Sequence, residues 1–292
     1  MAYQIFTDSC TDLSVKQMKE YNIDYLRMGI NVNTKEEYHA DLAFEEYSLE
    51  QLYNWIKDPN VHIKTSLITF QEVLEKFEPY LKKGIDILYI GCSGALSGSV
   101  NAVRLASEEL LQDYPERKII GIDSKRADMA LGALCFDACK LRDEGKSIEE
   151  AAEWVENNKQ FYHEIGSVEN LSYLRAMGRV SGPSAFFGNL IGIKPLIMFN
   201  RKGENYAFSK VRGMKAALEA SVQYIKDNME PGVTETIYVG SIMGDTYRDY
   251  MKEKIEKELG LKVETFPIGT IVGIGVGPGM YGCFFRGKEV EI

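Results

Sequence analysis

The stretch IDILYIGCSGALSGSVNAVRLASEELLQ, residues 85–112, contains three local patterns in succession. Residues 85–90 are almost continuously apolar, which is typical of a parallel strand buried on both faces. Residues 91–99 are rich in glycine and serine, and residues 100–112 place apolar side chains at helical spacing. A strand, a polar loop and a helix in this order predict a parallel sheet whose strands are joined by helices.

The same alternation continues on both sides of this stretch, through residues 1–158. Further strands are expected at residues 3–9, around 23–32 and at 118–123, with helices at about 14–21 and 126–145. Three more helices are expected to begin at the capping pairs Ser48/Gln51, Thr69/Glu72 and Ser147/Glu150. Strands that alternate with helices in this way indicate a doubly wound, mostly parallel α/β sheet.

Residues 159–292 show a different pattern. Residues 193–212 form two strand-like runs on either side of Arg201–Gly203, which is a hairpin signal. Other strands are expected at residues 161–168, 235–242, 262–268 and 280–286, and helices at 169–177, 213–229 and 245–259. Hairpins combined with packed helices predict an α+β domain with a mixed or antiparallel sheet. The polar stretch ENNKQ, residues 156–160, places the boundary between the two domains near residue 158.

The composition of the 292 residues excludes several classes of function. A net charge of −9 and a pI near 5.1 give little support for binding nucleic acid or an anionic membrane surface. No apolar run approaches the roughly 18 residues of a membrane span, and the first residues have no signal-peptide pattern. The five cysteines are scattered, which favours a reducing cytoplasm. Cys135 and Cys139 fall in an apolar helical pattern and are expected in the core.

The loop GCSGALSGS, residues 91–99, allows two interpretations. Free backbone N–H groups, the helix dipole and the hydroxyls of Ser93, Ser97 and Ser99 suit an anion. Alternatively, the loop is a plain strand-to-helix turn in which Ser97 or Ser99 caps the helix. A nucleotide phosphate loop is disfavoured because no lysine follows Gly98, and a hydrolase nucleophile elbow is disfavoured because Ala95 replaces its last glycine.

The three histidines, His39, His62 and His163, lie far apart in the sequence and in no catalytic motif. We interpret them as surface or structural residues, and they do not predict a metal site.

Two further hydroxyl-rich segments are expected beside this loop. Residues 8–12, with Asp8, Ser9 and Asp12, follow the first strand, and Thr65 and Ser66 precede the helix that Thr69 caps. Because the carboxyl ends of the strands in a doubly wound sheet line one crevice, segments 8–12, 65–69 and 91–99 should lie together there. Such a group of hydroxyls suits a small anion, although hydroxyls in turns commonly bond the local backbone instead.

The second half offers basic and glycine-rich candidates. Lys210 and Arg212 share one face of a predicted strand, and Arg179 lies just after a predicted helix. Each of these charges, taken alone, is interpreted as solvated. The segment GIGVGPG, residues 273–279, permits close approach of the backbone to a ligand.

Taken together, these segments resemble the DegV family, which contains the fatty-acid-binding subunits of bacterial fatty acid kinase. The matching motifs span nearly the whole chain and occur in the order of the family. They are FTDSCTDL (6–13), TS (65–66), SGALSGS (93–99), LSYLRAMGRVSG (171–182), IGIKPL (191–196), SKVR (209–212), GVGPG (275–279) and GCFF (282–285).

The resemblance implies a carrier without catalytic residues or a cofactor of its own. A long-chain fatty acid would lie between the two domains, with its carboxylate held by Thr65, Ser66, Ser97 and Gly98. A separate ATP-dependent kinase subunit would phosphorylate that carboxylate, and the carrier would deliver the acyl phosphate to lipid synthesis. The resemblance also places Arg212 and Gly275 near the phosphate or headgroup, and Arg179 at the contact with the kinase.

The sequence departs from the family pattern at two places. Gly275 occupies a position where many relatives have histidine, and Leu67-Ile68 replace the usual Gln-Pro after the TS motif. Two alternatives to the kinase-linked carrier therefore stay open. One is a fatty-acid carrier or sensor that works without a kinase, and the other is an enzyme acting on a small phosphorylated metabolite or nucleotide.

Overall fold

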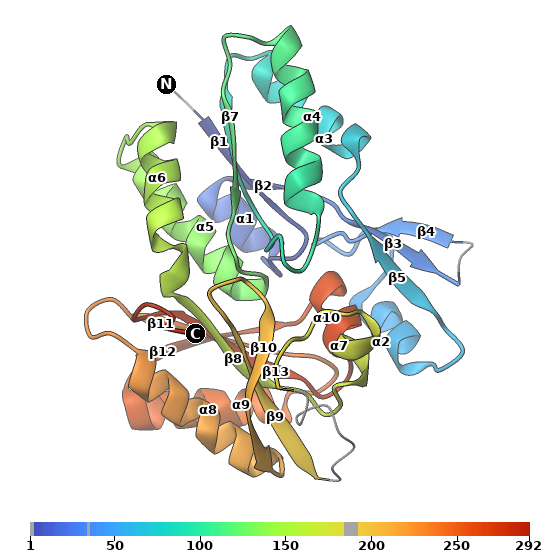
Figure 1. Ribbon diagram of the computed structural model, residues 1–292, viewed down its shortest axis with the longest axis vertical. Coiled ribbons are helices and arrows are strands. Elements are labelled where there is room, and N and C mark those ends of the chain that lie inside the picture. The colour runs from blue at the N-terminus through green and yellow to red at the C-terminus, as the bar shows by residue number, and fades with distance from the viewer. Residues whose placement is uncertain (1–2, 34–35, 184–191) are drawn as a thin grey trace.

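The parallel sheet expected in the first half is present in the computed structural model, which describes residues 3–33, 36–183 and 192–292. Its strands lie in the spatial order β2 (Ile23–Leu26), β1 (Tyr3–Asp8), β6 (Asp86–Gly91) and β7 (Ile119–Asp123). Every neighbouring pair runs parallel. β1 and β6 are buried along their whole length, as expected for strands with helices on both faces (Figure 1).

Helices cover the two faces of this sheet. α3 (Phe70–Leu81) and α4 (Ser99–Asp113) contact one face, whereas α5 (Asp128–Asp143) and α6 (Ile148–Asn158) contact the other (Figure 1). Two shorter helices, α1 (Val15–Tyr21) and α2 (Leu49–Lys57), complete this half. The doubly wound α/β arrangement predicted from the sequence is therefore confirmed.

Each predicted capping residue marks the start of a helix. Ser48, Thr69 and Ser147 each accept a hydrogen bond from the backbone N–H three residues later. Glu150 returns the bond to Ser147, but Glu72 does not reach back to Thr69. Glu72 instead pairs with Arg27, whose Nη2 lies 2.8 Å from Glu72 Oε2. Glu72 thus ties α3 to the segment that follows β2.

The single strand predicted around residues 23–32 is wrong, because two strands of different sheets occupy this stretch. β3 (Gly29–Val32) lies between β4 (Glu36–His39) and β5 (Ile63–Ser66) in a small antiparallel sheet that the sequence did not predict. At the break, the Arg27 N–H donates to Glu72 Oε1 and the Met28 N–H donates to Ser9 Oγ, each at 3.0 Å. Since side chains take these amides, the first sheet cannot continue past Leu26.

The second half contains the mixed sheet that the sequence predicted. Its spatial order is β10 (Asn205–Arg212), β9 (Ile193–Phe199), β8 (Tyr162–Ser167), β13 (Tyr281–Arg286), β11 (Thr236–Ser241) and β12 (Lys262–Pro267). Only β11 and β12 are parallel, and β9 and β10 form the predicted hairpin. α8 (Met214–Asn228) and α9 (Thr246–Leu259) pack on one face. The short helices α7 (Ser172–Ala176) and α10 (Thr270–Val276) lie below the first half (Figure 1).

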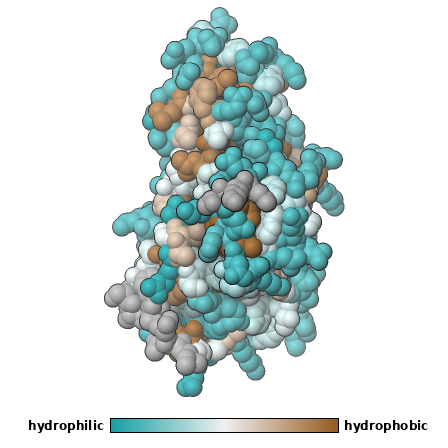
Figure 2. Space-filling model, turned by 90° about the vertical axis from the view of Figure 1, so that its right-hand side faces the viewer, coloured by the Kyte–Doolittle hydropathy of each residue, from teal (hydrophilic) through white to brown (hydrophobic). Residues whose placement is uncertain are grey.

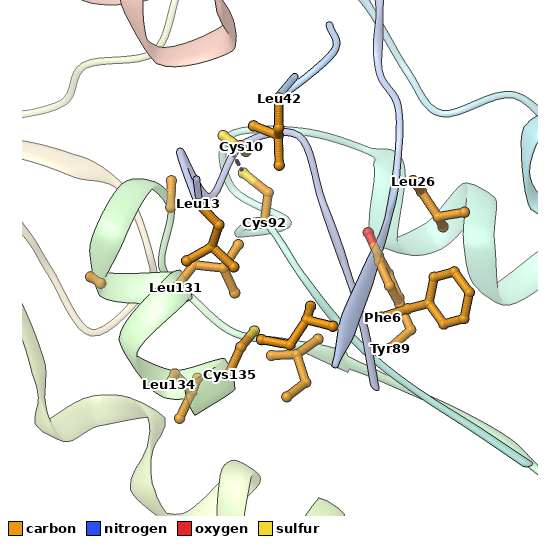
Figure 3. Close-up of a cluster of buried hydrophobic side chains, with 14 of the residues drawn as sticks. Phe6, Cys10, Leu13, Leu26, Leu42, Tyr89, Cys92, Leu131, Leu134 and Cys135 are labelled. Atoms are coloured by element: carbon orange, nitrogen blue, oxygen red, sulfur yellow. Dashed lines mark hydrogen bonds between the residues drawn. The ribbon is translucent and has the colours of Figure 1, made fainter. Parts of the chain in front are cut away.

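α5 joins the two halves because it contacts both sheets. It packs on β1 and β6 of the first sheet and on β8 and β13 of the second. Cys135 and Cys139 are both buried in α5, which confirms their expected place in the core. Figure 3 shows Cys135 among the buried apolar side chains. Arg126, just before α5, is fully buried and donates to the carbonyl oxygens of Tyr162 and Asn200. The parallel sheet lies entirely before residue 158 and the mixed sheet entirely after it, but one hydrophobic core crosses that point.

None of the helices described in the structure is long and apolar enough to cross a membrane. The first residue of the IGIKPL motif, Ile191, lies outside the described residues.

Candidate ligand-binding cavity

A cavity of about 320 Å³ lies where the parallel sheet meets the second half of the chain. This volume falls within the roughly 300–1,000 Å³ that is usual for small-molecule sites. Much of its wall is apolar and comes from both halves: Met28, Leu96, Leu174, Met177, Phe199 and Val276. Thr65, Ser66 and Ser97 contribute hydroxyl groups to the same cavity. An apolar cavity with a few convergent polar groups is the usual form of a site for a small organic ligand.

The loop after β6 forms one side of the cavity mouth. Ser97 Oγ and Ser99 Oγ lie 2.9 Å apart, and the Ile68 N–H donates to Ser99 Oγ at 3.3 Å. This bond holds the segment after Ser66 against the loop. The N-cap of α4 is Gly98, with no side-chain cap, so the interpretation in which Ser97 or Ser99 caps the helix is wrong. Ser97 Oγ still accepts a bond from the N–H of Ser99, the first residue of α4, at 3.3 Å, so this hydroxyl lies at the positive end of the helix dipole.

Thr65 and Ser66 lie at the end of β5, not in the turn that the sequence predicted. They pair with Ile30 and Gly29 of β3, and Thr69 alone makes the predicted cap. A Cβ at Gly29 would lie only 2.3 Å from Ser66 Oγ, so glycine leaves the space that this hydroxyl occupies. Small residues on β3 therefore help to set the position of Ser66.

We call Thr65, Ser66, Ser97 and Gly98 the rim of the cavity; the first three line it, whereas Gly98 lies next to Ser97 and is not a lining residue. Ser66 and Gly98 are exposed, and Thr65 and Ser97 are half-buried. Leu67, which also lines the cavity, is 48% exposed and would contact a Cβ built at Gly98 at 3.5 Å. Figure 2 shows a largely hydrophilic face on which hydrophobic residues gather in the upper part and near mid-height. The rim residues predicted from the sequence are thus brought together where solvent reaches the cavity.

The structure separates the two predicted arginines. Arg179 lines the cavity, donates through Nε to the Leu96 carbonyl and through Nη1 to the Met177 carbonyl at 2.8 Å. It therefore braces the loop beside Ser97. Arg212 is exposed at the end of β10, opposite Ile193, and is not among the residues that line the cavity. Its predicted place near a phosphate gains no support from this geometry.

Gly275 lines the cavity from α10, as its predicted place near the headgroup requires. A Cβ built there meets no atom within 4 Å. The position therefore has room for a side chain, and glycine leaves that space to the cavity.

The segment after β1 contributes differently from the prediction. Asp8 is buried and accepts bonds from the amides of Cys10 and Cys92 and from the Tyr89 hydroxyl, at 2.8–3.0 Å. Asp8 therefore holds the strand ends together, while Cys10 lines the cavity. The Cys10 and Cys92 sulfurs lie 3.3 Å apart and face each other in Figure 3. Asp8, Ser9 and Asp12 do not line the cavity, although residues 8–12 were expected to do so. The thiols of Cys10 and Cys92 line it instead.

The histidines have the structural roles expected from the sequence. His163 is buried between the Lys288 carbonyl and the Tyr224 hydroxyl, and burial lowers its pKa to about 4. His39 is exposed and bonds Glu46. Within the described ranges of the chain, no group of three or more His, Cys, Asp and Glu side chains could hold a metal ion.

Comparison with known proteins places the chain in a family. A family model described as that of the uncharacterised DegV proteins matches residues 2–288. The chain belongs to the DegV family. A DegV domain-containing protein of Clostridium perfringens is 32% identical over 290 residues, covering 99% of both chains, and one of Clostridium acetobutylicum is 30% identical over 285 residues, covering 98% of both.

Solved structures of DegV proteins share the fold. A stearic-acid-binding protein of Eubacterium ventriosum has a TM-score of 0.86 at 21% identity, with 97% of this chain and 98% of that chain covered. The fatty acid kinase B3 protein of Streptococcus pneumoniae, loaded with linoleic acid, has a TM-score of 0.82 at 20% identity, with both chains fully covered. At such identities the likeness concerns the DegV fold alone.

Among the lining residues that sequence reasoning missed are two acidic ones, Asp128 and Glu164. The signal available for each was a single acidic residue within an apolar run, in ADMALGALC for Asp128 and in YHEIGSV for Glu164. We call these two side chains the interior carboxyls.

Proposed function

We propose that this DegV protein binds one long-chain fatty acid in the cavity, with the carboxylate at the rim and the acyl chain in the apolar interior. The observation that carries this proposal is that the hydroxyls of Thr65, Ser66 and Ser97 line the more exposed part of an apolar cavity, with Ser97 at the first amide of α4. Hydroxyls and a helix N-terminus can hold a carboxylate without a cationic partner. Fatty acids bound to structural relatives support the same ligand class.

Burial of the acyl chain would supply the affinity. About fifteen methylenes at roughly 0.8 kcal/mol each give on the order of 10 kcal/mol before the cost of association. A small phosphorylated metabolite would gain little from walls such as Phe199 and Val276. The geometry therefore favours the fatty acid over the enzyme alternative.

Extraction of lipid from the purified protein tests this proposal. Denaturing mass spectrometry should find a C14–C18 acid, and the delipidated protein should take up added oleate. Protein that carries no lipid and does not take up oleate would contradict the proposal. Thermal stabilisation by nucleotides or sugar phosphates, but not by oleate, would favour the enzyme alternative.

We further propose that the bound carboxylate is presented to a separate ATP-dependent kinase subunit, which phosphorylates it to an acyl phosphate for lipid synthesis. Arg179 supports this proposal because it is an exposed cation beside the rim. The carrier works, in this proposal, in a reducing cytoplasm, which suits five cysteines that are all free thiols.

Reconstitution with candidate kinase subunits and ATP separates this role from that of a carrier that needs no kinase. Acyl phosphate should form on the loaded protein. If no kinase forms acyl phosphate while fatty-acid binding is intact, the result would favour the carrier that needs no kinase. The exposed position of Arg212 and the glycine at 275 keep that alternative open.

A further inference from the structure

The interior carboxyls are two buried acidic groups of the cavity that the proposed carboxylate site does not use. Asp128 is 1% exposed and Glu164 is 7% exposed, and both line the same cavity as Ser97. Asp128 Oδ1 accepts a bond from the Met129 N–H at 2.7 Å. Asp128 Oδ2 and Glu164 Oε2 are buried without a hydrogen-bond partner in the described part of the chain. Buried oxygens without partners are costly, so these two call for a group that the protein itself does not supply.

The interior carboxyls are buried, whereas the rim residues are exposed or half-buried, so the pair lies deeper in the cavity than the rim. Asp128 begins α5 and Glu164 lies in the middle of β8, whereas the rim belongs to β5 and the loop before α4. Glu164 also borders a much smaller adjoining hollow of about 10 Å³, whose wall includes the buried Ser167 and Met280. The pair therefore faces the part of the cavity that would hold the acyl chain beyond its headgroup.

Burial favours the neutral form of both carboxyls. Burial raises the pKa of Glu164 to about 8, although Arg126 lowers it in part. Burial, with the nearby Asp12 and Glu164, raises the pKa of Asp128. The Arg126 guanidinium meanwhile donates to the carbonyl oxygens of Tyr162, Lys125 and Asn200 and to the Gln160 side chain. A protonated carboxyl offers one O–H donor and one carbonyl acceptor, which attracts a neutral polar group rather than a cation.

A hydroxyl group fits this pair because it can both donate and accept a hydrogen bond. We propose that the cavity recognises a fatty acid whose acyl chain carries a hydroxyl group along its length, hydrogen-bonded by Asp128 and Glu164. This inference rests on the proposed function and names the ligand class within it. A plain acyl chain would leave both oxygens unpaired, and sites built around a ligand hydroxyl discriminate strongly against analogues that lack it.

Competitive binding to the delipidated protein tests the inference. Stearic acid is compared at pH 7 with monohydroxystearic acids of the same length, with the hydroxyl placed near the carboxylate, at mid-chain and towards the methyl end. At least one mid-chain or distal isomer should bind about tenfold more tightly than stearic acid, the equivalent of one good hydrogen bond. Stearic acid that binds as tightly as every isomer overturns this inference but leaves the proposed function standing. Failure of all the acids to bind overturns both.

Substitutions test whether the interior carboxyls cause the tighter binding of a hydroxystearic acid. Glu164→Met, which keeps the length and removes the hydrogen-bonding group, should abolish the preference, and Glu164→Gln should restore it. Glu253→Gln, an exposed residue of α9, is the matched control and should leave it unchanged. A preference that survives in folded Glu164→Met overturns the assignment. If Glu164→Met does not fold, Asp128→Gly replaces it, because glycine tolerates the positive φ of 53° at this residue and removes the carboxyl. Asp128→Gly should likewise abolish the preference, and a preference that survives in the folded variant overturns the assignment.

Discussion

The rim of the cavity carries its polar groups within reach of water, whereas the interior carries two of them where water is scarce. A hydroxyl such as that of Ser97 can bond water when no ligand is bound, so it costs the protein little. Glu164 Oε2 has neither a protein partner nor exposure, so it lowers stability unless a ligand group or a bound water meets it. In the two proposals above, the rim therefore sets whether an acid binds, and the interior sets which acid binds.

Removal of the rim hydroxyls should have the largest effect. Ser97→Ala combined with Thr65→Val deletes two hydrogen bonds to the carboxylate, each worth roughly 1.5–3 kcal/mol when the partner is charged. The affinity for oleate should fall on the order of 100-fold, measured by fluorescence displacement. Thr265→Val, on exposed β12, is the control and should bind normally. Unchanged affinity in the double variant would show that the carboxylate lies elsewhere.

The interior carboxyls should govern how stability varies with pH. Burial raises the pKa of Glu164 from its ordinary 4.5 to about 8, so the folded protein holds this proton more tightly than the unfolded chain. The pH-dependent stabilisation from the protonated Glu164 is therefore fully present below pH 4.5 and is lost as the pH rises through about 8. Burial raises the pKa of Asp12 to about 7, which acts in the same direction.

Thermal melts of the ligand-free protein between pH 6.5 and 8 should show this loss. Burial lowers the pKa of His163 from 6.5 to about 4, so this residue makes stability rise with pH. That rise is nearly complete at pH 6.5, so it does not mask the fall expected between pH 6.5 and 8. The melting temperature should drop by several degrees across the window, and less in Glu164→Gln. A melting temperature that rises with pH would contradict the buried, protonated state.

Two glycines at the edge of the cavity should respond oppositely to alanine. At Gly277, which has φ +71°, a Cβ would lie 2.3 Å from Tyr173 Cδ2, so Gly277→Ala should cost about 1–3 kcal/mol of stability. At Gly275 the Cβ meets nothing, so Gly275→Ala should gain about 0.5–1 kcal/mol as a helix substitution. Denaturant unfolding measures both. If both substitutions destabilise the protein equally, Gly275 has no room for a side chain beside it.

The smallest effect is expected from the two arginines. Arg179→Gln loses the bond that braces Leu96 beside the rim, so the affinity for oleate should weaken about fivefold, roughly 1 kcal/mol. Arg212→Gln should leave it unchanged, because Arg212 does not line the cavity. A loss in Arg212→Gln equal to that in Arg179→Gln would place the headgroup nearer to β10 than the structure indicates.

The sequence predicted the rim better than the interior, and the reason is physical. Rim residues such as Ser97 lie in a local strand–loop–helix pattern, which neighbouring residues reveal. Asp128 and Glu164 lie within apolar runs whose periodicity describes the core, and only the tertiary fold brings them to one cavity. The small sheet was missed for a similar reason. β5 pairs with β3 across more than thirty residues, and the break after Leu26 depends on Glu72 and Ser9, which no local pattern links to it.

The position of β13 has a consequence for how the chain is made. This strand is the last in the sequence, yet it lies in the middle of the mixed sheet, between β8 and β11, and packs on α5. During synthesis the earlier strands must wait for residues 281–286 before the sheet is continuous, and until then the part of α5 that β13 covers stays open. Such late, long-range pairing slows folding and exposes apolar surface to aggregation.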